Sequence, residues 1–321
     1  MTTLRNNEVP AGGRPVRAPS LWQSARKHWL LYLLLVPGIV QLLIFKVAPL
    51  FGLAIAFQNY STFVGIWDSP WVGLEHFHRF FNDPYIYILV RNTVLLALIT
   101  LLVGFPIPIV FALFLNEIRL RFIKKFVQIM SFFPYFISAA VMVSILYTVL
   151  SPQNGIVNQL LNWLGLESVF FMASPAWFRP LYATLHVWHT FGYFAIVYLA
   201  SMTTIDPSMY EAAEIDGAGR WKKMFYVTLP SLAGIITVMF IVSIGNIFTV
   251  DLDKILLMYN PSIYETADVI QSYVYRQAFA PQGFPNYSFG AAVSLVQSVI
   301  ALVLVLTANQ AAKRYSSTKL F

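Results

Sequence analysis

Long apolar runs alternate with short polar segments along most of this chain. A helix that crosses a membrane needs about 20 apolar residues with almost no charge. Six segments meet this requirement, and each is predicted to span a membrane: residues 29–57, 89–115, 126–150, 180–203, 231–250 and 288–310. Lys46 interrupts the first segment, so either its outer half is irregular or the lysine extends to the interface. Pro106 and Pro108 predict a kink in the second.

The composition supports this pattern and sets the fold class. Of the 321 residues, 58% are hydrophobic and 11% are charged, whereas soluble domains have about 25% charged residues. The prediction is therefore an all-α integral membrane protein with one six-helix domain at residues 29–310. Polar tails are predicted at residues 1–28 and 311–321, and the first lacks the apolar core of a signal peptide. The absence of cysteine excludes a disulfide framework and thiolate metal sites.

The distribution of basic residues predicts the orientation in the membrane. Four segments hold 15 of the 21 Lys and Arg residues: the N-terminal tail, the second–third connection, the fourth–fifth connection and the C-terminal tail. The positive-inside rule places both termini and the connection at residues 206–230 in the cytoplasm. The net charge of +7 therefore reflects topology, and nucleic acid is not a predicted partner. The aromatic-rich external connections, 58–88 and 151–179, suit interfacial helices or a surface for an outside partner.

The fourth–fifth connection is predicted to be a helical hairpin. Asp206 can cap the free N–H groups of a helix, and Pro207 suits the first helical position. The helix is expected to run to Asp216, because Gly217 supplies the left-handed stop that follows many helices. A second short helix is expected over residues 218–226. Acidic residues fall on the first arm and basic residues on the second.

The same connection carries a spaced set of residues: Glu211, Ala212, Ala213, Gly217, Val227, Leu229 and Pro230. This set resembles the EAA signature of binding-protein-dependent ABC importer permeases, with Val227 where that family usually has isoleucine. Segments elsewhere, including "SPWVGLEHF" and "FFPYFISAAVMVSIL", resemble the permeases for complex oligosaccharides and polysaccharide fragments in the maltose-type group. The resemblance covers nearly the whole chain.

The resemblance implies a type I ABC importer permease fold in the bacterial cytoplasmic membrane, with lipid around it. Its implied partners are a second homologous permease in a heterodimer, two ATP-binding subunits and an extracytoplasmic solute-binding protein. The implied cargo is an oligosaccharide, with alginate- and pectin-derived sugars among the candidates. By analogy with the family, the residues that contact the ATPase are Glu211, Ala212, Ala213, Asp216, Gly217, Arg220 and Lys222. ATP and Mg²⁺ belong to the partner subunits, because this chain has no Gly-rich phosphate-binding loop. No cofactor is predicted for the chain itself.

Polar and aromatic residues inside the predicted spans are candidates for the substrate pathway, since they are costly in lipid and suit contacts with sugars. These candidates are Tyr135, His186, Trp188, His189 and Asn246. His186 and His189 share a helical face, but hydrogen bonding between helices explains them as well as a sugar contact does. Two histidines without a further ligand do not predict a metal site.

Two other classes of function fit the residues less well. An ion-coupled secondary transporter or channel would require acidic residues in the spans, and no span has one at its centre. A membrane enzyme built on His186 and His189 would lack a nucleophile and a carboxylate partner. Asp251, Asp253 and Lys254 lie at the outer end of the fifth segment. They are expected either to meet the binding protein or to pair with one another.

Overall fold

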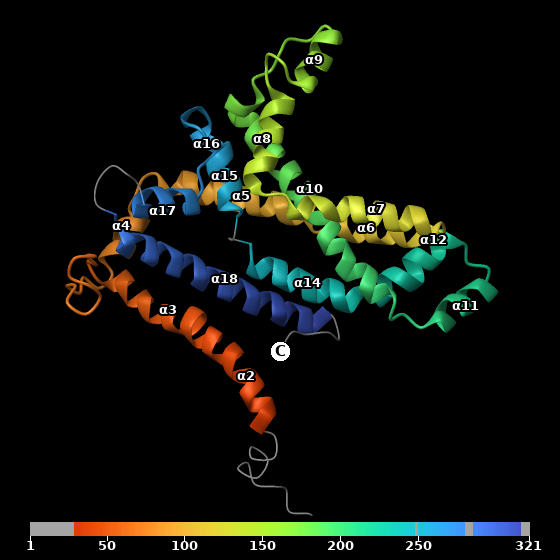
Figure 1. Cartoon of the computed structure of the whole chain (residues 1–321), viewed down its shortest axis with the longest axis horizontal. Coiled ribbons are helices and arrows are strands. Elements are labelled where there is room, and N and C mark those ends of the chain that lie inside the picture. The colour runs from red at the N-terminus through yellow and green to blue at the C-terminus, as the bar shows by residue number, and fades with distance from the viewer. Residues whose placement is uncertain (1–28, 248–249, 280–284, 316–321) are drawn as a thin grey trace, which may run out of the picture. The chain divides into compact units, whose positions relative to one another are not determined.

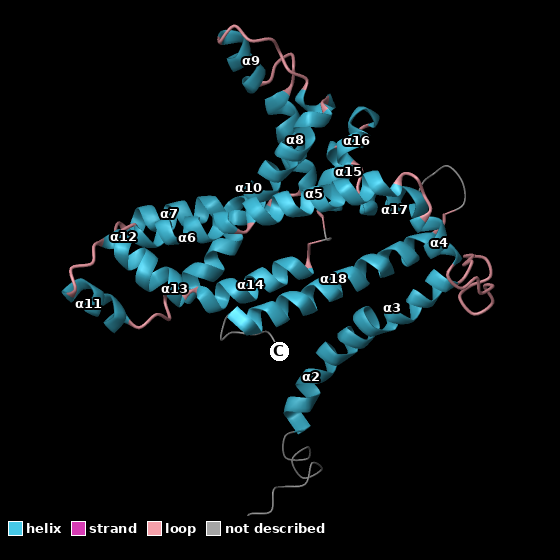
Figure 2. Ribbon diagram, turned by 180° about the vertical axis from the view of Figure 1, so that it is seen from behind, coloured by secondary structure: helices cyan, strands magenta, loops and turns pink. Residues whose placement is uncertain are grey.

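The computed structural model of the protein describes residues 29–247, 250–279 and 285–315, and its regular structure is helical throughout (Figures 1 and 2). Within these ranges no strand forms, and the only extended pairing is an isolated bridge between Gln58 and Trp71. The predicted all-α class is confirmed. The predicted N-terminal tail, 1–28, and residues 316–321 of the C-terminal tail lie outside the described residues.

The chain divides into two compact units at Leu53. The described part of the first unit contains α2 (Trp29–Leu42), the π-helical turn η1 (Leu43–Val47) and α3 (Ala48–Phe51). Lys46 lies in η1, so the irregularity that its charge predicted is present. With η2 (Gly52–Phe57) these elements form a 29-residue apolar segment long enough to cross a membrane.

In the second unit, α4 (Glu75–Phe81) precedes the long helical pair α5 (Ile86–Gly104) and α6 (Pro106–Glu117). The predicted interruption of this pair falls at Phe105, because Pro106 has no N–H to continue the ladder of hydrogen bonds. The two helices together form a second apolar segment of spanning length.

The third predicted span is not a straight helix. It divides into α7 (Arg121–Phe132) with the 3₁₀ turn η3 (Phe133–Phe136), followed by α8 (Ala139–Leu150), and the two parts meet at 103°. The break follows Pro134, and the hydroxyl of Ser138 caps α8 by accepting from the N–H of Val141. The apolar run had concealed this bend, because an N-cap serine is also compatible with the middle of an apolar segment.

The helix α10 (Pro175–Met202) has 28 residues and packs against α5, α6 and α7 (Figure 1). It follows α9 (Ile156–Trp163) and η4 (Phe171–Ala173). Its Gly192 lies against the carbonyl group of Ser131 in α7, where a Cβ atom would have no room.

The predicted hairpin forms as α11 (Pro207–Ile215) and a second helical arm made of α12 (Arg220–Lys223), η5 (Met224–Thr228) and α13 (Leu229–Ser231). This arm continues through Pro230 and meets α14 (Ala233–Gly245) at 59°. The helix of the fifth predicted span therefore begins just after this bend and ends before Asn246.

The last part of the chain contains four short helices and one long one. They are α15 (Leu252–Met258), η6 (Pro261–Ile263), α16 (Tyr264–Ala267), α17 (Ile270–Phe279) and α18 (Tyr287–Tyr315). The long helix α18 runs beside α14 and packs against α17 and α4 (Figure 2).

Of the described helices, three are long and apolar enough to cross a membrane, and the number rises to five if each bent pair counts as one span. The three are Trp29–Phe57, Ile86–Glu117 and Tyr287–Ala312. The helix α10 is not among them, because polar side chains occupy one of its faces. The number of six spans and the orientation of the termini stay predictions.

Candidate functional site

A cavity of about 550 Å³ lies among α5, α6, α10 and α14. The residues that line it are mainly apolar, with aromatic rings and a few polar groups between them. The polar and aromatic lining residues are Thr100, Phe105, Tyr135, Tyr182, His186, His189, Thr190, Phe194, Tyr198, Ser243, Asn246 and Asp251. A concave, largely apolar site with a few placed polar groups is the usual form of a small-molecule site.

One face of α10 supplies most of the polar groups. Tyr182, His186 and His189 recur at intervals of four and three residues, which places them on one side of a helix. All three line the cavity, so the predicted shared face of the two histidines is confirmed. Trp188 is two residues from His186 and therefore points elsewhere; it is exposed and is not among the lining residues.

A four-residue polar cluster closes one side of this cavity. Oδ2 of Asp251 lies 2.6 Å from Nζ of Lys254 and 3.0 Å from Nδ1 of His186. Nζ of Lys254 also lies 3.0 Å from Nδ1 of His189. Because an ammonium group can only donate, this nitrogen of His189 must be the acceptor. The Lys254 side chain is 2% exposed, so its charge depends on these partners.

Of the two expectations for these acidic and basic residues, pairing is observed, and contact with the binding protein stays a prediction. Asp251 and Lys254 pair with one another inside the protein, while Asp253 is exposed on α15. The cluster also corrects the expectation that the histidines lack a carboxylate partner, since Asp251 supplies one to His186. Sequence reasoning missed Asp251 as a cavity residue, and Lys254 as its buried partner, because 65 residues separate each from the histidine that it contacts.

Aromatic rings form a stacked series beside the cluster. The ring of Tyr135, in η3, lies parallel to Tyr193 with centroids 4.1 Å apart and to His189 at 5.6 Å. Tyr135 also lines the cavity, where the sequence predicted a substrate contact. Flat, partly exposed rings of this kind provide apolar faces on which a sugar ring can stack.

Asn246 lines the cavity, but not from the middle of a helix as expected. It is the C-cap of α14, and its amide donates to the carbonyl of Val242 at 3.2 Å. Within the described residues, no group of three or more His, Cys, Asp and Glu side chains could hold a metal ion.

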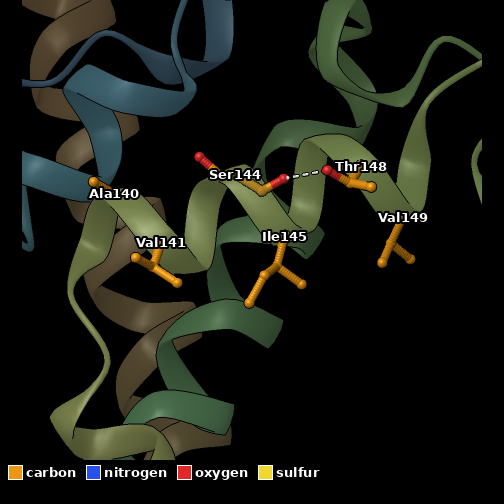
Figure 3. Close-up of a pocket in the computed structure, with 6 residues that line it drawn as sticks. All are labelled: Ala140, Val141, Ser144, Ile145, Thr148 and Val149. Carbon is orange, nitrogen blue, oxygen red and sulfur yellow. Dashed lines mark hydrogen bonds between the residues drawn. The ribbon is translucent and has the colours of Figure 1, made fainter.

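A second, shallow pocket lies on α8 alone (Figure 3). Val141, Ile145 and Val149 project from the same side of the helix, and the hydroxyl of Thr148 bonds to the carbonyl of Ser144. No charged residue lines it. With groups from only one helix, it offers a polar ligand little to bind.

The helical hairpin at residues 206–230 is the second candidate site. The carboxylate of Asp206 accepts the N–H of Ser208 at 2.9 Å, and this bond lowers the pKa of Asp206. Gly217 has a φ of +73°, and the N–H of Ala218 reaches the carbonyl of Ala213 at 2.9 Å. These are the start and the left-handed stop that the sequence predicted.

Two side-chain contacts join the arms of the hairpin. Nζ of Lys223 lies 2.7 Å from Oε2 of Glu214, and the hydrogen bond and charge of Lys223 lower the pKa of Glu214. The hydroxyl groups of Tyr210 and Thr228 are 2.9 Å apart. The sequence places acidic residues on the first arm and basic residues on the second. It did not predict that Glu214 and Lys223 pair with each other.

The outer surface of the hairpin combines charges with apolar groups. Glu211, Asp216, Arg220 and Lys222 are exposed, and no residue of α11 or α12 is buried. Ile215 is 87% exposed and Trp221 62%, so large apolar side chains lie among these charges. Such a surface is typical of a contact with another protein.

Comparison with known proteins gives one consistent result. Residues 104–315 match the family described as "Binding-protein-dependent transport system inner membrane component". Among curated relatives in Bacillus subtilis (strain 168), the polygalacturonan/rhamnogalacturonan transport system permease protein YteP is 39% identical over 91% of this chain and 90% of that protein. Protein LplB of the same organism is 38% identical over 94% of each.

A solved structure gives the same result for the fold. A chain in the crystal structure of a bacterial alginate ABC transporter, in complex with an alginate pentasaccharide-bound periplasmic protein, matches with a TM-score of 0.85 and 37% identity. The match covers 94% of this chain and 100% of the other.

Proposed function

We propose that this chain conducts acidic oligosaccharides through the cavity between α5, α10 and α14. The premise is that the chain belongs to the family of binding-protein-dependent transport system inner membrane components and is a permease component of a sugar ABC importer. The family assignment confirms the resemblance seen in the sequence. It favours the hypothesis of an ABC importer subunit over the two alternative hypotheses, an ion-coupled transporter and a membrane enzyme.

The single observation that carries this proposal is the chemistry of the cavity wall. Tyr135 offers a flat ring, while His186, Thr190 and Asn246 offer hydrogen-bonding groups at the same surface. Sugars present both apolar ring faces and hydroxyl groups, and such a wall can contact both. The acidic character of the cargo is supported by the relatives, which include a polygalacturonan permease and a transporter of the acidic polysaccharide alginate.

The proposed topology has six spans with both termini in the cytoplasm of a bacterium. The five spans that length and composition allow leave α10 as the sixth. Its polar face lines the cavity, and its neighbours α5 and α6 cover other parts of it, so lipid need not contact its histidines. An even number of spans agrees with the basic residues at both ends of the sequence.

The proposed partners are a second homologous permease, two ATP-binding subunits that hold ATP and Mg²⁺, and an extracytoplasmic solute-binding protein. The hairpin is the proposed contact with an ATP-binding subunit. The exposed and partly exposed residues that would carry this contact are Glu211, Ala212, Ala213, Asp216, Gly217, Arg220 and Lys222. Lys223 and Glu214 would hold the two arms together while force passes between the proteins.

Transport by the assembled importer in liposomes tests the proposal. The preparation contains this chain, its partner permease, the ATP-binding subunits and the binding protein, and it is offered uronate-containing and neutral oligosaccharides. Uptake and stimulated ATP hydrolysis are expected with the uronate class. Tyr135→Ala, which removes the stacked ring, is expected to lower uptake at least about tenfold if it removes about 1.4 kcal/mol of cargo binding.

Val141→Ala, on the separate pocket of α8, is the matched control and should transport normally. If both variants transported as the parent does, the cavity would not be the route. If no uronate oligosaccharide stimulated hydrolysis, the cargo class would be wrong.

A further inference from the structure

Two arginine side chains meet at one buried asparagine. Nη2 of Arg179, in α10, lies 2.8 Å from Oδ1 of Asn92, and Nη2 of Arg91, in α5, lies 3.5 Å from the same oxygen. The two nitrogens can be no further apart than the sum of those distances. Two guanidinium groups, which are always charged, therefore lie side by side.

Asn92 is fully buried and has no hydrogen-bonding capacity left over. Its amide nitrogen donates to the carbonyl groups of Glu265 and Asp268, at 2.9 Å in both cases. Its side-chain oxygen accepts hydrogen bonds from both arginines. Asn92 thus fixes the position of the pair but adds no negative charge to balance it.

No carboxylate within the described residues forms an ion pair with either arginine. Besides Asn92, Arg91 donates to the backbone carbonyl of Glu265 at 3.1 Å, while the side chain of Glu265 is exposed and acts on Arg179 at longer range. The Nε atoms of both arginines are buried without a hydrogen-bond partner among the described residues. Since each guanidinium carries five donors, most of them are unused.

Arg276 shows how this chain treats an arginine with a structural role. Both of its terminal nitrogens bind the carboxylate of the fully buried Asp268, and its guanidinium lies over three tyrosine rings. In the part of the chain that the structure describes, Arg91 and Arg179 pair with no carboxylate and lie over no aromatic ring. Their hydrogen bonds to Asn92 and to the carbonyl of Glu265 hold them in place, but the two like charges have no directly paired carboxylate among the described residues, which is costly to the free protein.

The pair lies on the approach to the cavity. Arg179 precedes Tyr182 by three residues and His186 by seven, so all three lie on one face of α10. Seven residues of helix correspond to about 10 Å. In the proposed topology, Arg179 is near the extracytoplasmic end of α10, and a linear molecule in contact with His186 would reach it.

We propose that Arg91 and Arg179 together bind a carboxylate of an acidic oligosaccharide as it enters the cavity. The inference rests on the proposed function, because it requires that the cavity is the sugar route. The ligand's chemical class follows from the geometry: two neighbouring guanidinium forks with free donors match the paired oxygens of a carboxylate. A bound uronate would supply the negative charge that the site lacks.

The test compares one uronate oligosaccharide with its carboxyl-reduced form of equal length, in the assembled importer. Arg91→Gln and Arg179→Gln are each expected to lower uptake of the uronate form about tenfold and to leave uptake of the reduced form unchanged. Arg179→Lys keeps the charge but loses the forked guanidinium. Its uptake of the uronate form is expected to lie between that of the parent and that of Arg179→Gln. Arg79→Gln is the matched control, because the guanidinium of Arg79 lies over the ring of Phe289. This variant should retain the preference for the uronate.

A second measurement separates binding from a structural role. Without sugar, Arg91→Gln and Arg179→Gln should unfold at the same temperature as the parent or higher, because each relieves repulsion between like charges. A clear loss of thermal stability would make the pair structural and would overturn the proposal. Equal loss of uptake for both sugar forms would also overturn it, since the effect of the arginines would then not depend on the carboxylate of the sugar. If the parent itself moved neither form, the proposed function would have failed, whereas normal uptake by all variants would contradict only the arginine site.

Discussion

The ammonium nitrogen of Lys254 lies 2.6 Å from Oδ2 of Asp251, and the lysine side chain is only 2% exposed. The same oxygen lies 3.0 Å from His186, so Asp251 joins α15 to α10 beside the cavity. A buried ammonium group keeps its charge only where a counter-charge accompanies it. Asp251 therefore holds this wall of the cavity together.

Asp251→Asn is expected to destabilise the protein, because it leaves the charge of Lys254 buried without a counter-charge. Breaking a fully buried pair costs about 3–5 kcal/mol. The Asp251 side chain is 39% exposed, so water screens part of the interaction and about 2 kcal/mol is expected here. Denaturant unfolding of the purified protein in detergent measures the difference.

Asp253→Asn is the control for this change, since Asp253 lies on the same helix, is exposed and forms no ion pair within the described residues. It should stay within about 0.5 kcal/mol of the parent. Adding Lys254→Met to Asp251→Asn should restore part of the lost stability, because the unpaired charge is then gone. Additive losses in the double variant would show that the two residues are not coupled.

Gly217→Ala is expected to impair coupling between the hairpin and an ATP-binding subunit. Gly217 has a φ of +73°, and an L-residue in this conformation costs about 1–2 kcal/mol. The turn that ends α11 should open, which faster hydrogen exchange of α11 would report. Hydrolysis of ATP should then respond less to the loaded binding protein.

Gly219→Ala provides a closely matched comparison. Both glycines have open space where a Cβ would lie, but Gly219 has a φ of −69°, which alanine adopts without strain. This variant should couple as the parent does. Equal behaviour of the two variants would mean that the left-handed turn has no part in coupling.

Glu214 is expected to titrate at a lower pH than an ordinary glutamate. The hydrogen bond from Lys223 and then its charge lower the pKa of Glu214 in the folded protein. The stabilising effect of the pair is thus fully present above the unfolded value of about 4.3 and is lost as the pH falls through the lower folded pKa. Carboxyl-carbon NMR of labelled protein measures this pKa directly.

Lys223→Met should move the pKa of Glu214 upward, back toward its ordinary value. Lys222→Met removes an equal charge from the adjacent position, but Lys222 is exposed and forms no ion pair with Glu214 among the described residues. Its effect on the same resonance should be smaller. An unchanged pKa in the Lys223 variant would contradict the link between the two arms.

Asn158→Leu is expected to destabilise the connection between α8 and α9. The buried amide of Asn158 donates to the carbonyl groups of Leu150, Ser151 and Val169 and accepts the N–H of Val169 at 2.8 Å. Each buried polar group left without a partner costs about 1–3 kcal/mol, so a loss of about 3 kcal/mol or more is expected. Thermal unfolding and limited proteolysis within residues 151–174 measure it.

Asn162→Leu, one turn further along α9, is the control. Asn162 is exposed and accepts one hydrogen bond from Ser168, so its replacement should have little effect. Similar losses in both variants would indicate that the apolar side chain, and not the missing hydrogen bonds, causes the damage.

The sequence alone determined the features that depend on neighbouring residues. Helices form where apolar residues run without charge, and the start and stop of α11 follow from Asp206, Pro207 and Gly217. These signals are local, since capping and a positive φ involve only a few consecutive residues. The spacing from Glu211 to Pro230 also indicated the family, because the whole signature lies within one connection and needs no long-range contact to be read.

Only the tertiary structure decided which distant groups meet. Asp251 pairs with His186 of α10, and Arg179 of α10 meets Arg91 of α5 at Asn92. The burial of Lys254 also depends on elements distant in the sequence. The bend at Ser138 was likewise seen only in the structure, where α7 packs against α10 and α8 against α15. Long-range packing sets the burial of each charge and the identity of its partner, and the order of residues along a chain does not contain these directly.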